Sequence, residues 1–422
     1  MKTTARADLV FLLPGPGTRR SALGRFLAIR FMISAVLSHR HFAAAAVAFA
    51  TILSANAGTF TWLETNSAGG NDNWLLKGNY AEYPTPGNTG NFPVTNADSF
   101  LFDAGTRSAT INSSQTIGKL TVGVNYGNVN ISQSGSSVLT LQSGGSGVTN
   151  AGIEVSSGRT TNTNIHVRLN LSGDIVFTNN GSARLRIGNN TNGNGGLQGS
   201  GTLDLRGGVI LLPELVNHTY SGAVTVGNGA TLQVNSGASF TSYSSLDVGA
   251  TGNLTGGGTF AGANVHSGGR ISPGGEGNVA TSPATLTFTN LLTLQSTGLV
   301  TIDVRATGAD AINATNGVTL GGELRLRLNS DYTTAGTYQI LSGLDGASGN
   351  FNTVNIRTEA DSADKADLTD NGSGIWTGAF AGRGYDVTFD ANSGLLTLTA
   401  IPEPSHLLLS TLGVMTLLRR RR

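Results

Sequence analysis

The sequence predicts an all-β protein, built as a right-handed parallel β-helix or related β-solenoid, with an N-terminal signal peptide and a short C-terminal hydrophobic helix. Glycine accounts for 60 of the 422 residues, about twice the usual ~7%. Only 12% of the residues are charged, against the usual ~25%. Short runs that alternate apolar and polar residues recur roughly every 15 to 25 residues, which is about one turn of a β-solenoid.

The first 57 residues are predicted to be a signal peptide with an over-extended start. The apolar run at 42–53 has signal-peptide length, and Ala55 and Ala57 supply the small residues of a signal-peptidase site. We expect cleavage after Ala57. The preceding residues are long and basic for an n-region, which favours Met32 as the true start; an extended n-region from Met1 is the alternative.

Charge and cysteine content restrict the function classes. The first 57 residues hold seven basic residues and one acid, and four arginines end the chain, so residues 58–404 carry a net charge of about −9. Such a surface has no electrostatic footprint for nucleic acid. No cysteine is present, so stability is expected from repetitive backbone hydrogen bonds and a thin apolar core.

Residues 58–110 are predicted to form an N-terminal capping segment. Trp62 and Trp74 lie among turn-forming residues, and Phe100 and Phe102 alternate with small or polar ones. Bulky aromatic side chains at the first turn of a solenoid would shield its open sheet edge and its core. A sugar-stacking platform made by the two tryptophans is the alternative interpretation.

Residues 111–400 are predicted to form the solenoid itself. Period-two alternation bounded by Gly, Asn and Ser predicts strands at 119–124, 138–143, 174–179, 184–189 and 202–207. Inward Val, Leu and Ile would fill a narrow core. Gly and Asn would take the tight corners, where φ is positive.

The clearest repeat lies at 215–239. Its sequence, LVNHTYSGAVTVGNGATLQVNSGAS, resembles the autotransporter-associated β-strand repeat. The resemblance implies a corner at Asn217, Thr219, Tyr220 and Gly222, and strands at 224–226 and 231–234. We expect the variable corner residue, His218, to face solvent. Further strand patterns follow at 284–304, 309–328 and 385–400, and the acidic stretch 359–370 is expected to interrupt them.

Candidate chemistry is sparse, and we predict no catalytic residue, cofactor or metal site. Two arginine pairs beside acidic residues could line an anionic-sugar groove, but solvated charge pairs are the simpler interpretation. These residues are Arg184, Arg186, Arg325, Arg327, Asp174, Asp204, Asp303 and Glu323. A weak Ca²⁺ loop is conceivable at Asp361, Asp364, Asp367 and Asp370, although a solvated acidic loop is favoured. The histidines of this region, His166, His218 and His266, are far apart in sequence.

The last segment, 401–422, is predicted to be a targeting segment. It contains Pro402, Glu403 and Pro404, an apolar run at 407–418, and Arg419, Arg420, Arg421 and Arg422. A helix over 405–418 would cover only about 21 Å, less than the ~30 Å bilayer core, so a transient membrane contact is expected. The order of these features resembles the PEP-CTERM sorting signal. The resemblance implies an exosortase-type processing enzyme as partner, acting near the Pro-Glu-Pro motif; an ordinary tail anchor is the alternative.

Together these features predict an exported, non-enzymatic structural or adhesive protein of the cell surface or extracellular matrix. It would associate with biofilm exopolysaccharide through many weak contacts, and it would end either anchored or released. Two alternatives remain. The first is a β-helical polysaccharide lyase or hydrolase, and the second is a matrix protein that self-associates into fibres.

Overall fold

The computed structural model describes residues 59–62, 80–83, 99–102, 108–124, 127–144, 150–188, 195–213, 216, 218–266, 268–274, 282–332, 335–358 and 364–402. Regular secondary structure in these ranges is β-strand, apart from one 3-10 turn at Ala381–Arg383. The expected signal peptide with Ala55 and Ala57, Trp74, and the sorting-signal residues 403–422 lie outside them. Within the described ranges, no helix has the length and apolar character needed to cross a bilayer.

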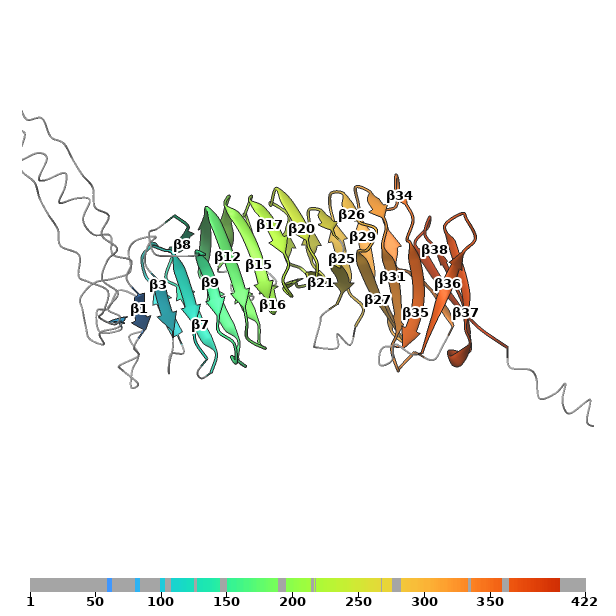
Figure 1. Cartoon of the computed structure of the whole chain (residues 1–422), viewed down its shortest axis with the longest axis horizontal. Coiled ribbons are helices and arrows are strands. Elements are labelled where there is room, and N and C mark those ends of the chain that lie inside the picture. The colour runs from blue at the N-terminus through green and yellow to red at the C-terminus, as the bar shows by residue number, and fades with distance from the viewer. Residues whose placement is uncertain are drawn as a thin grey trace, which may run out of the picture. The chain divides into compact units, whose positions relative to one another are not determined.

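One long sheet, sheet A, contains thirteen strands. Its order is β2 (Tyr80–Tyr83), β1 (Thr59–Trp62), β3 (Ser99–Phe102), β6 (Lys119–Val122), β9 (Gly152–Val155), β12 (Asp174–Asn179), β15 (Thr202–Gly207), β17 (Ala223–Val226), β20 (Ser245–Val248), β23 (Ala263–Val265), β26 (Leu292–Leu294), β30 (Val318–Leu320) and β34 (Ser348–Gly349). From β1 onward, each strand pairs in parallel with the next, and they follow one another in sequence order (Figure 1).

A second long sheet, sheet B, is parallel from β4 to β35. It contains β4 (Ser108–Ile111), β7 (Val129–Gln133), β10 (Thr163–His166), β13 (Leu185–Ile187), β16 (Val209–Leu212), β18 (Thr231–Val234), β21 (Asn253–Gly256), β24 (Arg270–Pro273), β27 (Leu299–Arg305), β31 (Glu323–Leu328) and β35 (Thr353–Thr358).

Two shorter parallel sheets supply a third face. Sheet C contains β5 (Gln115–Ile117), β8 (Val138–Gln142), β11 (Arg168–Ser172) and β14 (Gly196–Gly199). Sheet D contains β19 (Ser239–Phe240), β22 (Thr259–Phe260), β25 (Thr285–Phe288), β29 (Ala311–Ala314) and β33 (Leu341–Ser342). The chain visits A, B and then C or D in turn, except that it passes from β16 directly to β17, so each full turn adds one strand to A and one to B. This all-β arrangement of parallel sheets in register is consistent with a parallel β-solenoid.

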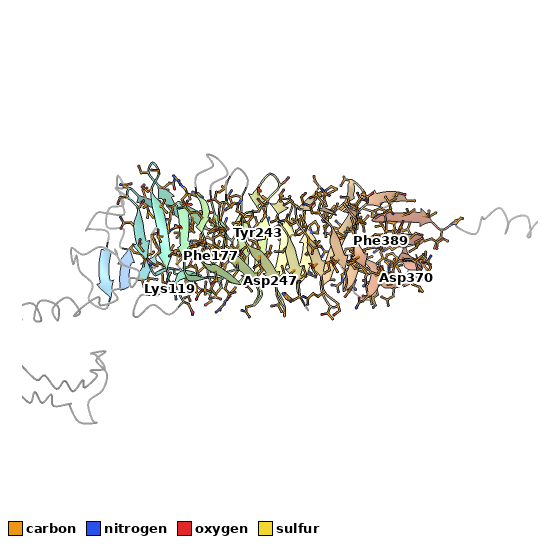
Figure 2. The ribbon with its side chains drawn as sticks, turned by 90° about the horizontal axis from the view of Figure 1, so that it is seen from above. Lys119, Phe177, Tyr243, Asp247, Asp370 and Phe389 are labelled. Carbon is orange, nitrogen blue, oxygen red and sulfur yellow. The ribbon has the colours of Figure 1, made fainter. Side chains whose placement is uncertain are left out.

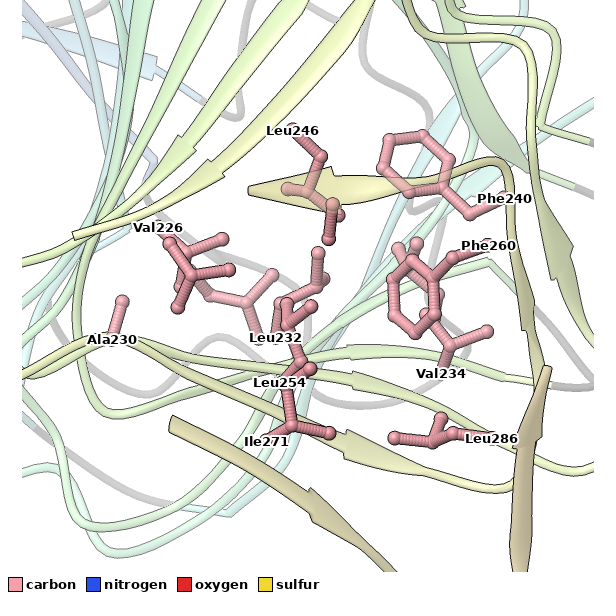
Figure 3. Close-up of a cluster of buried hydrophobic side chains, with 14 of the residues drawn as sticks. Val226, Ala230, Leu232, Val234, Phe240, Leu246, Leu254, Phe260, Ile271 and Leu286 are labelled. Atoms are coloured by element: carbon pink, nitrogen blue, oxygen red, sulfur yellow. The ribbon is translucent and has the colours of Figure 1, made fainter. Parts of the chain in front are cut away.

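The core is a column of apolar side chains between the sheets. Strand alternation produces it: in β12, for example, Ile175 and Phe177 are buried and the residues between them are more exposed. In sheet D, Phe240, Phe260 and Phe288 are paired in register on successive turns. The rings of Phe260 and Phe288 stack with centroids 5.6 Å apart. Figure 3 shows Phe240 and Phe260 beside aliphatic side chains from sheets A and B.

The predicted strands are present, and three are shorter than predicted: 119–124 keeps Lys119–Val122, 138–143 keeps Val138–Gln142, and 184–189 is shortened at both ends. Residues 174–179 and 202–207 form β12 and β15 as expected. The run at 184–189 keeps only Leu185–Ile187 as strand. Gly188 ends it with φ +111°, and a Cβ there would lie 2.6 Å from a Val216 methyl carbon, so only glycine fits. Residues stacked on successive turns are 17 to 34 positions apart, which is more variable than the predicted spacing.

The N-terminal strands extend sheet A beyond the first full turn. β1 pairs in parallel with β3 but antiparallel with β2, the strand at the edge. Phe100 and Phe102 are buried, with ring centroids 5.1 Å apart. The side chain of Trp62 on β1 lies outside the described residues. The capping role of residues 58–110 stays a prediction.

Parallel pairing does not continue to residue 400 as expected. After β35 the chain forms antiparallel strands β36 (Lys365–Asp370), β37 (Ile375–Phe380), β38 (Tyr385–Asp390) and β39 (Leu395–Ala400). β39 also pairs antiparallel with β32 (Gly336–Gln339), and a short antiparallel hairpin joins β27 to β28 (Gly308–Ala309). The expected acidic loop at 359–370 is therefore wrong for 365–370, because β36 buries Leu368 against the end of the solenoid.

Candidate functional site

An uninterrupted row of polar side chains runs along the outer face of sheet A. The register places seven residues opposite one another on successive strands, and we call them the polar ladder: Asp204, Thr225, Asp247, Asn264, Thr293, Thr319 and Ser348. Each of the first five strands places a buried apolar residue on either side of its ladder residue, which turns the polar side chain outward. With strands about 4.8 Å apart, the ladder extends over about 29 Å.

Hydrogen bonds join two pairs of neighbouring side chains in the polar ladder. Asn264 Nδ2 donates to Asp247 Oδ1 at 3.3 Å, and Gln295 Nε2 donates to Asn264 Oδ1 at 3.1 Å. At the far end, the hydroxyl of Ser348 donates to that of Thr319 at 3.4 Å. Figure 2 labels Asp247 midway along the stack of strands. These bonds restrict Asp247 and Asn264, and Thr319 and Ser348, before any ligand arrives, which lowers the entropy cost of binding at these positions.

The two carboxylates of the polar ladder are paired. Arg206 lies 2.6 Å from Asp204, and His266 Nε2 lies 3.0 Å from Asp247 Oδ1. The other five ladder residues are neutral. The ladder therefore presents mainly hydroxyl and amide groups, which suits a neutral, hydroxyl-rich chain.

The arginine pair of β31 makes charge pairs with acidic neighbours. Arg327 contacts Asp303 through two nitrogens, with Nε 2.5 Å and Nη2 2.9 Å from the carboxylate oxygens, and Arg305 lies 3.1 Å from the same carboxylate. Arg325 lies 3.0 Å from Glu323. These contacts agree with the simpler interpretation of charge pairing.

Glu323 remains ionised despite partial burial. Burial opposes ionisation, but the hydrogen bond from Asn355 and the charge of Arg325 outweigh it and hold the pKa of Glu323 below its usual value. Asp303 and Glu323 are thus both engaged by cationic or amide groups. A carboxylate held in this way is poorly placed to act as a general acid or base.

The other arginine pair is separated from its candidate partner. Arg186 lies on β13 of sheet B, with Arg184 just before that strand, whereas Asp174 lies on β12 of sheet A. Asp174 Oδ1 instead accepts a hydrogen bond of 2.8 Å from the hydroxyl of Thr202. The alternative of an anionic-sugar groove is therefore not supported at this position.

His218 is buried, so the expectation that it faces solvent is wrong. Only 2% of its surface is exposed, its Nδ1 accepts a hydrogen bond from the Leu197 amide at 3.2 Å, and its ring meets Phe240 edge-on at 5.8 Å. Burial lowers the pKa of His218 to about 4. Tyr220 of the same corner is also buried, and its single O–H is shared between the carbonyls of Gly201 and Ala223, so the corner turns inward.

A pocket lies at the C-terminal end of the solenoid, beside the last two strands of sheet A. This end pocket has a volume of about 280 Å³. It is lined by Leu320, Leu344, Gly346, Ala347, Gly349, Asn350, Ser373, Gly374, Ala391 and Asn392. Gly349 directly follows Ser348, the last residue of the ladder, and Leu320 directly follows Thr319.

Two hairpin turns with the same pattern, Asp-x-x-Ser-Gly, form one side of the end pocket. Asp370 Oδ1 accepts the amides of Gly372 and Gly374 at 3.0 and 3.1 Å. Asp390 accepts the Asn392 amide at 2.9 Å and the hydroxyl of Ser393 at 2.7 Å. These bonds, led by that of Ser393, hold the pKa of Asp390 below its usual value. Both carboxylates thus fix the turns that carry the pocket residues.

Asn350 links the last solenoid turn to the antiparallel strands. Its Nδ2 donates to Asp370 Oδ2 at 2.8 Å. Its Oδ1 accepts the amide of Phe351 at 2.9 Å and the indole N–H of the buried Trp376 at 3.2 Å. The end pocket is therefore held by side chains with fixed positions.

The remaining predicted residues are largely outside the described part of the chain. Pro402 is exposed just after β39, where the Ile401 amide donates to the carbonyl of Gly384 at 2.8 Å. Glu403, Pro404 and 405–422 are not described. Of the acidic stretch, Asp364 pairs with Arg383 at 3.2 Å. Among the described residues, no group of three or more His, Asp or Glu side chains is placed to hold a metal ion.

Comparison of the chain with protein-family models, with curated proteins and with solved structures finds no match.

Proposed function

We propose that this chain is an exported structural or adhesive protein of the cell surface or extracellular matrix, without enzymatic activity, that is retained by polysaccharide along its polar ladder. The single observation that carries this proposal is the ladder itself: seven polar residues in register over about 29 Å on one face of a regular stack. A polymer that repeats hydroxyl groups can contact many such residues at once. Weak bonds then add up to firm retention.

The export route is inferred from both ends of the sequence. Signal peptidase would cut after Ala57, and an exosortase-type enzyme would act near Pro402, Glu403 and Pro404, while residues 405–418 contact the membrane. The resemblance to the PEP-CTERM signal and to autotransporter-associated repeats supports this route. We infer that the solenoid is right-handed, because connections between parallel strands are right-handed in nearly all proteins.

The test is co-sedimentation of the full chain with polysaccharide purified from its native host. A triple variant of the polar ladder, Thr225→Ala, Asn264→Ala and Thr319→Ala, removes three side chains that can hydrogen-bond a polymer. At about 1 kcal/mol for each bond, retention should fall by tenfold or more. The wild-type chain failing to bind any secreted polysaccharide of the host would overturn the proposal.

The matched control changes three comparable polar residues on sheets C and D: Thr140→Ala, Asn170→Ala and Thr287→Ala. Retention of this variant should equal that of the wild type, since the proposal assigns binding to sheet A. Equal losses in both variants would show that polymer binding has no preferred face. A fall in polysaccharide viscosity on incubation, with or without Ca²⁺, would favour the lyase or hydrolase alternative instead. Concentration-dependent sedimentation of the protein alone would favour the fibre alternative.

A further inference from the structure

The position of the end pocket at the last step of the polar ladder suggests a second kind of contact. We propose that the end pocket receives the terminal, neutral sugar residue of a polysaccharide chain that lies along the ladder. This inference rests on the proposed function and adds a specific site to it. The sequence alone gave no sign of the pocket, because its lining comes from four separate segments: β30, 344–350, 373–374 and 391–392.

The size and lining of the end pocket fit one sugar ring. Its volume of about 280 Å³ is slightly below the range of drug-sized ligand pockets, ~300–1,000 Å³, so it suits a small ligand such as one sugar ring. A pyranose ring has apolar C–H faces and a rim of hydroxyl groups. The end pocket matches both, since Leu320, Leu344 and Ala391 provide apolar surface. Asn350 and Asn392 provide the amide groups that can bond hydroxyls.

The side-chain amides of Asn350 and Asn392 have one unused donor and one unused acceptor between them. The Asn350 amide has two N–H groups, and in the described part of the chain only one of them has a partner, on Asp370. Asn392 uses both N–H groups, on the Ser373 carbonyl at 2.8 Å and on Asp390 at 3.1 Å, so its Oδ1 is left to accept. Each hydroxyl group of a sugar both donates and accepts, so the several hydroxyls of one sugar ring can meet both unused positions.

The charges behind the end pocket favour a neutral sugar over an acidic one. None of the described residues that line the pocket carries a charged side chain. Asp370 and Asp390 stand behind the two turns and direct their oxygens to the N–H and O–H groups of those turns (Figure 2 labels Asp370). A uronate placed in the pocket would face two carboxylates without a cation among the lining residues, which disfavours it.

The rim of the end pocket is exposed beside the last residue of the polar ladder. Ser348, Ala347 and Gly346 are exposed, whereas Ala391 on the opposite wall is buried. Ala347 therefore allows the pocket to be filled by a larger side chain without disturbing the core. Ala379 on β37 is a matched control, since it is also an exposed alanine of the C-terminal strands and is not part of the lining.

The experiment compares the full-length wild type with Ala347→Phe and Ala379→Phe. The probes are neutral oligosaccharides made by partial hydrolysis of the host polysaccharide, and uronate-containing oligosaccharides of the same length, measured by calorimetry. We expect the wild type to bind the neutral set, Ala347→Phe to bind it at least tenfold more weakly, and Ala379→Phe to bind it like the wild type. Circular dichroism and urea unfolding check that both variants fold.

Three results would overturn the inference: equal binding by Ala347→Phe and wild type, preference of the wild type for the uronate set, or no oligosaccharide binding while the intact polysaccharide is still retained. The last result would leave the proposed function in place, because the polar ladder alone would then account for retention. Loss of binding to oligosaccharides and to the intact polymer alike would remove both proposals.

Discussion

Replacing Asp310 with asparagine is expected to stabilise the solenoid in alkaline solution and to change little in acid. Asp310 is only 2% exposed. Its Oδ1 accepts the Ala284 amide at 2.8 Å, and its Oδ2 is buried without a hydrogen-bond partner. Burial raises the pKa of Asp310 to about 7; the Ala284 bond and Arg305 oppose this, and Asp303 adds to it.

The magnitude follows from linkage between protonation and folding. An aspartate in the unfolded chain has a pKa of about 3.9, so the native state holds this proton more tightly than the unfolded state does. The contribution of Asp310 to stability is therefore fully present below about pH 4 and is lost as the pH rises to the folded pKa of about 7. Three pKa units correspond to about 4 kcal/mol, which is an upper figure because the buried site can relax. Asparagine keeps the acceptor for Ala284 and carries no charge, so Asp310→Asn should recover most of this loss at pH 8.

The assay is urea unfolding of the full chain at pH 4 and pH 8. The wild type should lose stability between these values, and Asp310→Asn should lose about 2 to 4 kcal/mol less. Asp386→Asn serves as control, since Asp386 is exposed on β38. Identical pH profiles for the wild type and Asp310→Asn would refute the reasoning, because the carboxylate would then ionise in the folded state at no cost.

Three further predictions concern the core of the stack. Burial depresses the pKa of His218, so stability should fall by about 3 kcal/mol as the pH drops from 6.5 to 4, and His218→Gln should remove that dependence in a pH series of urea melts. Phe260→Ala removes a ring that stacks on Phe288 and should lower the free energy of unfolding by about 3 to 5 kcal/mol in chemical denaturation. Leu291 is 53% exposed, so Leu291→Ala should lower it by less than about 0.5 kcal/mol. Equal losses would argue against a stabilising stack of phenylalanine rings. Tyr220→Phe leaves the Gly201 carbonyl without its hydroxyl donor and should lower the free energy of unfolding by about 1 to 3 kcal/mol. An unchanged free energy of unfolding would show that this bond is dispensable.

Much of the solenoid could be predicted from local pattern because its strands are short and alternate strictly. Glycine marked the ends where a side chain has no room, as at Gly188. The change to antiparallel strands after β35 was missed, because alternation is the same in both kinds of sheet. A usable signal was present: Asn371-Gly372, between two alternating runs, is typical of a tight hairpin turn.

The candidate site could not be predicted because it depends on register over many turns. The residues Asp247 and Asn264 are 17 positions apart, whereas Thr319 and Ser348 are 29 apart, yet both pairs are neighbours in the polar ladder. Insertions at corners change the spacing at little cost in free energy, so sequence distance does not reveal which residues stack. His218 was misplaced for a related reason: a corner residue turns inward when the next turn supplies an aromatic partner, here Phe240.

The most direct test of the export and sorting account is intact-mass and N-terminal analysis of the protein recovered separately from the envelope and the medium of its native host. The account predicts a chain that starts at Gly58 and ends near Pro404. A mature protein that retains Arg419 to Arg422 would contradict it, because the C-terminal segment would then be a permanent tail anchor and not a signal for processing.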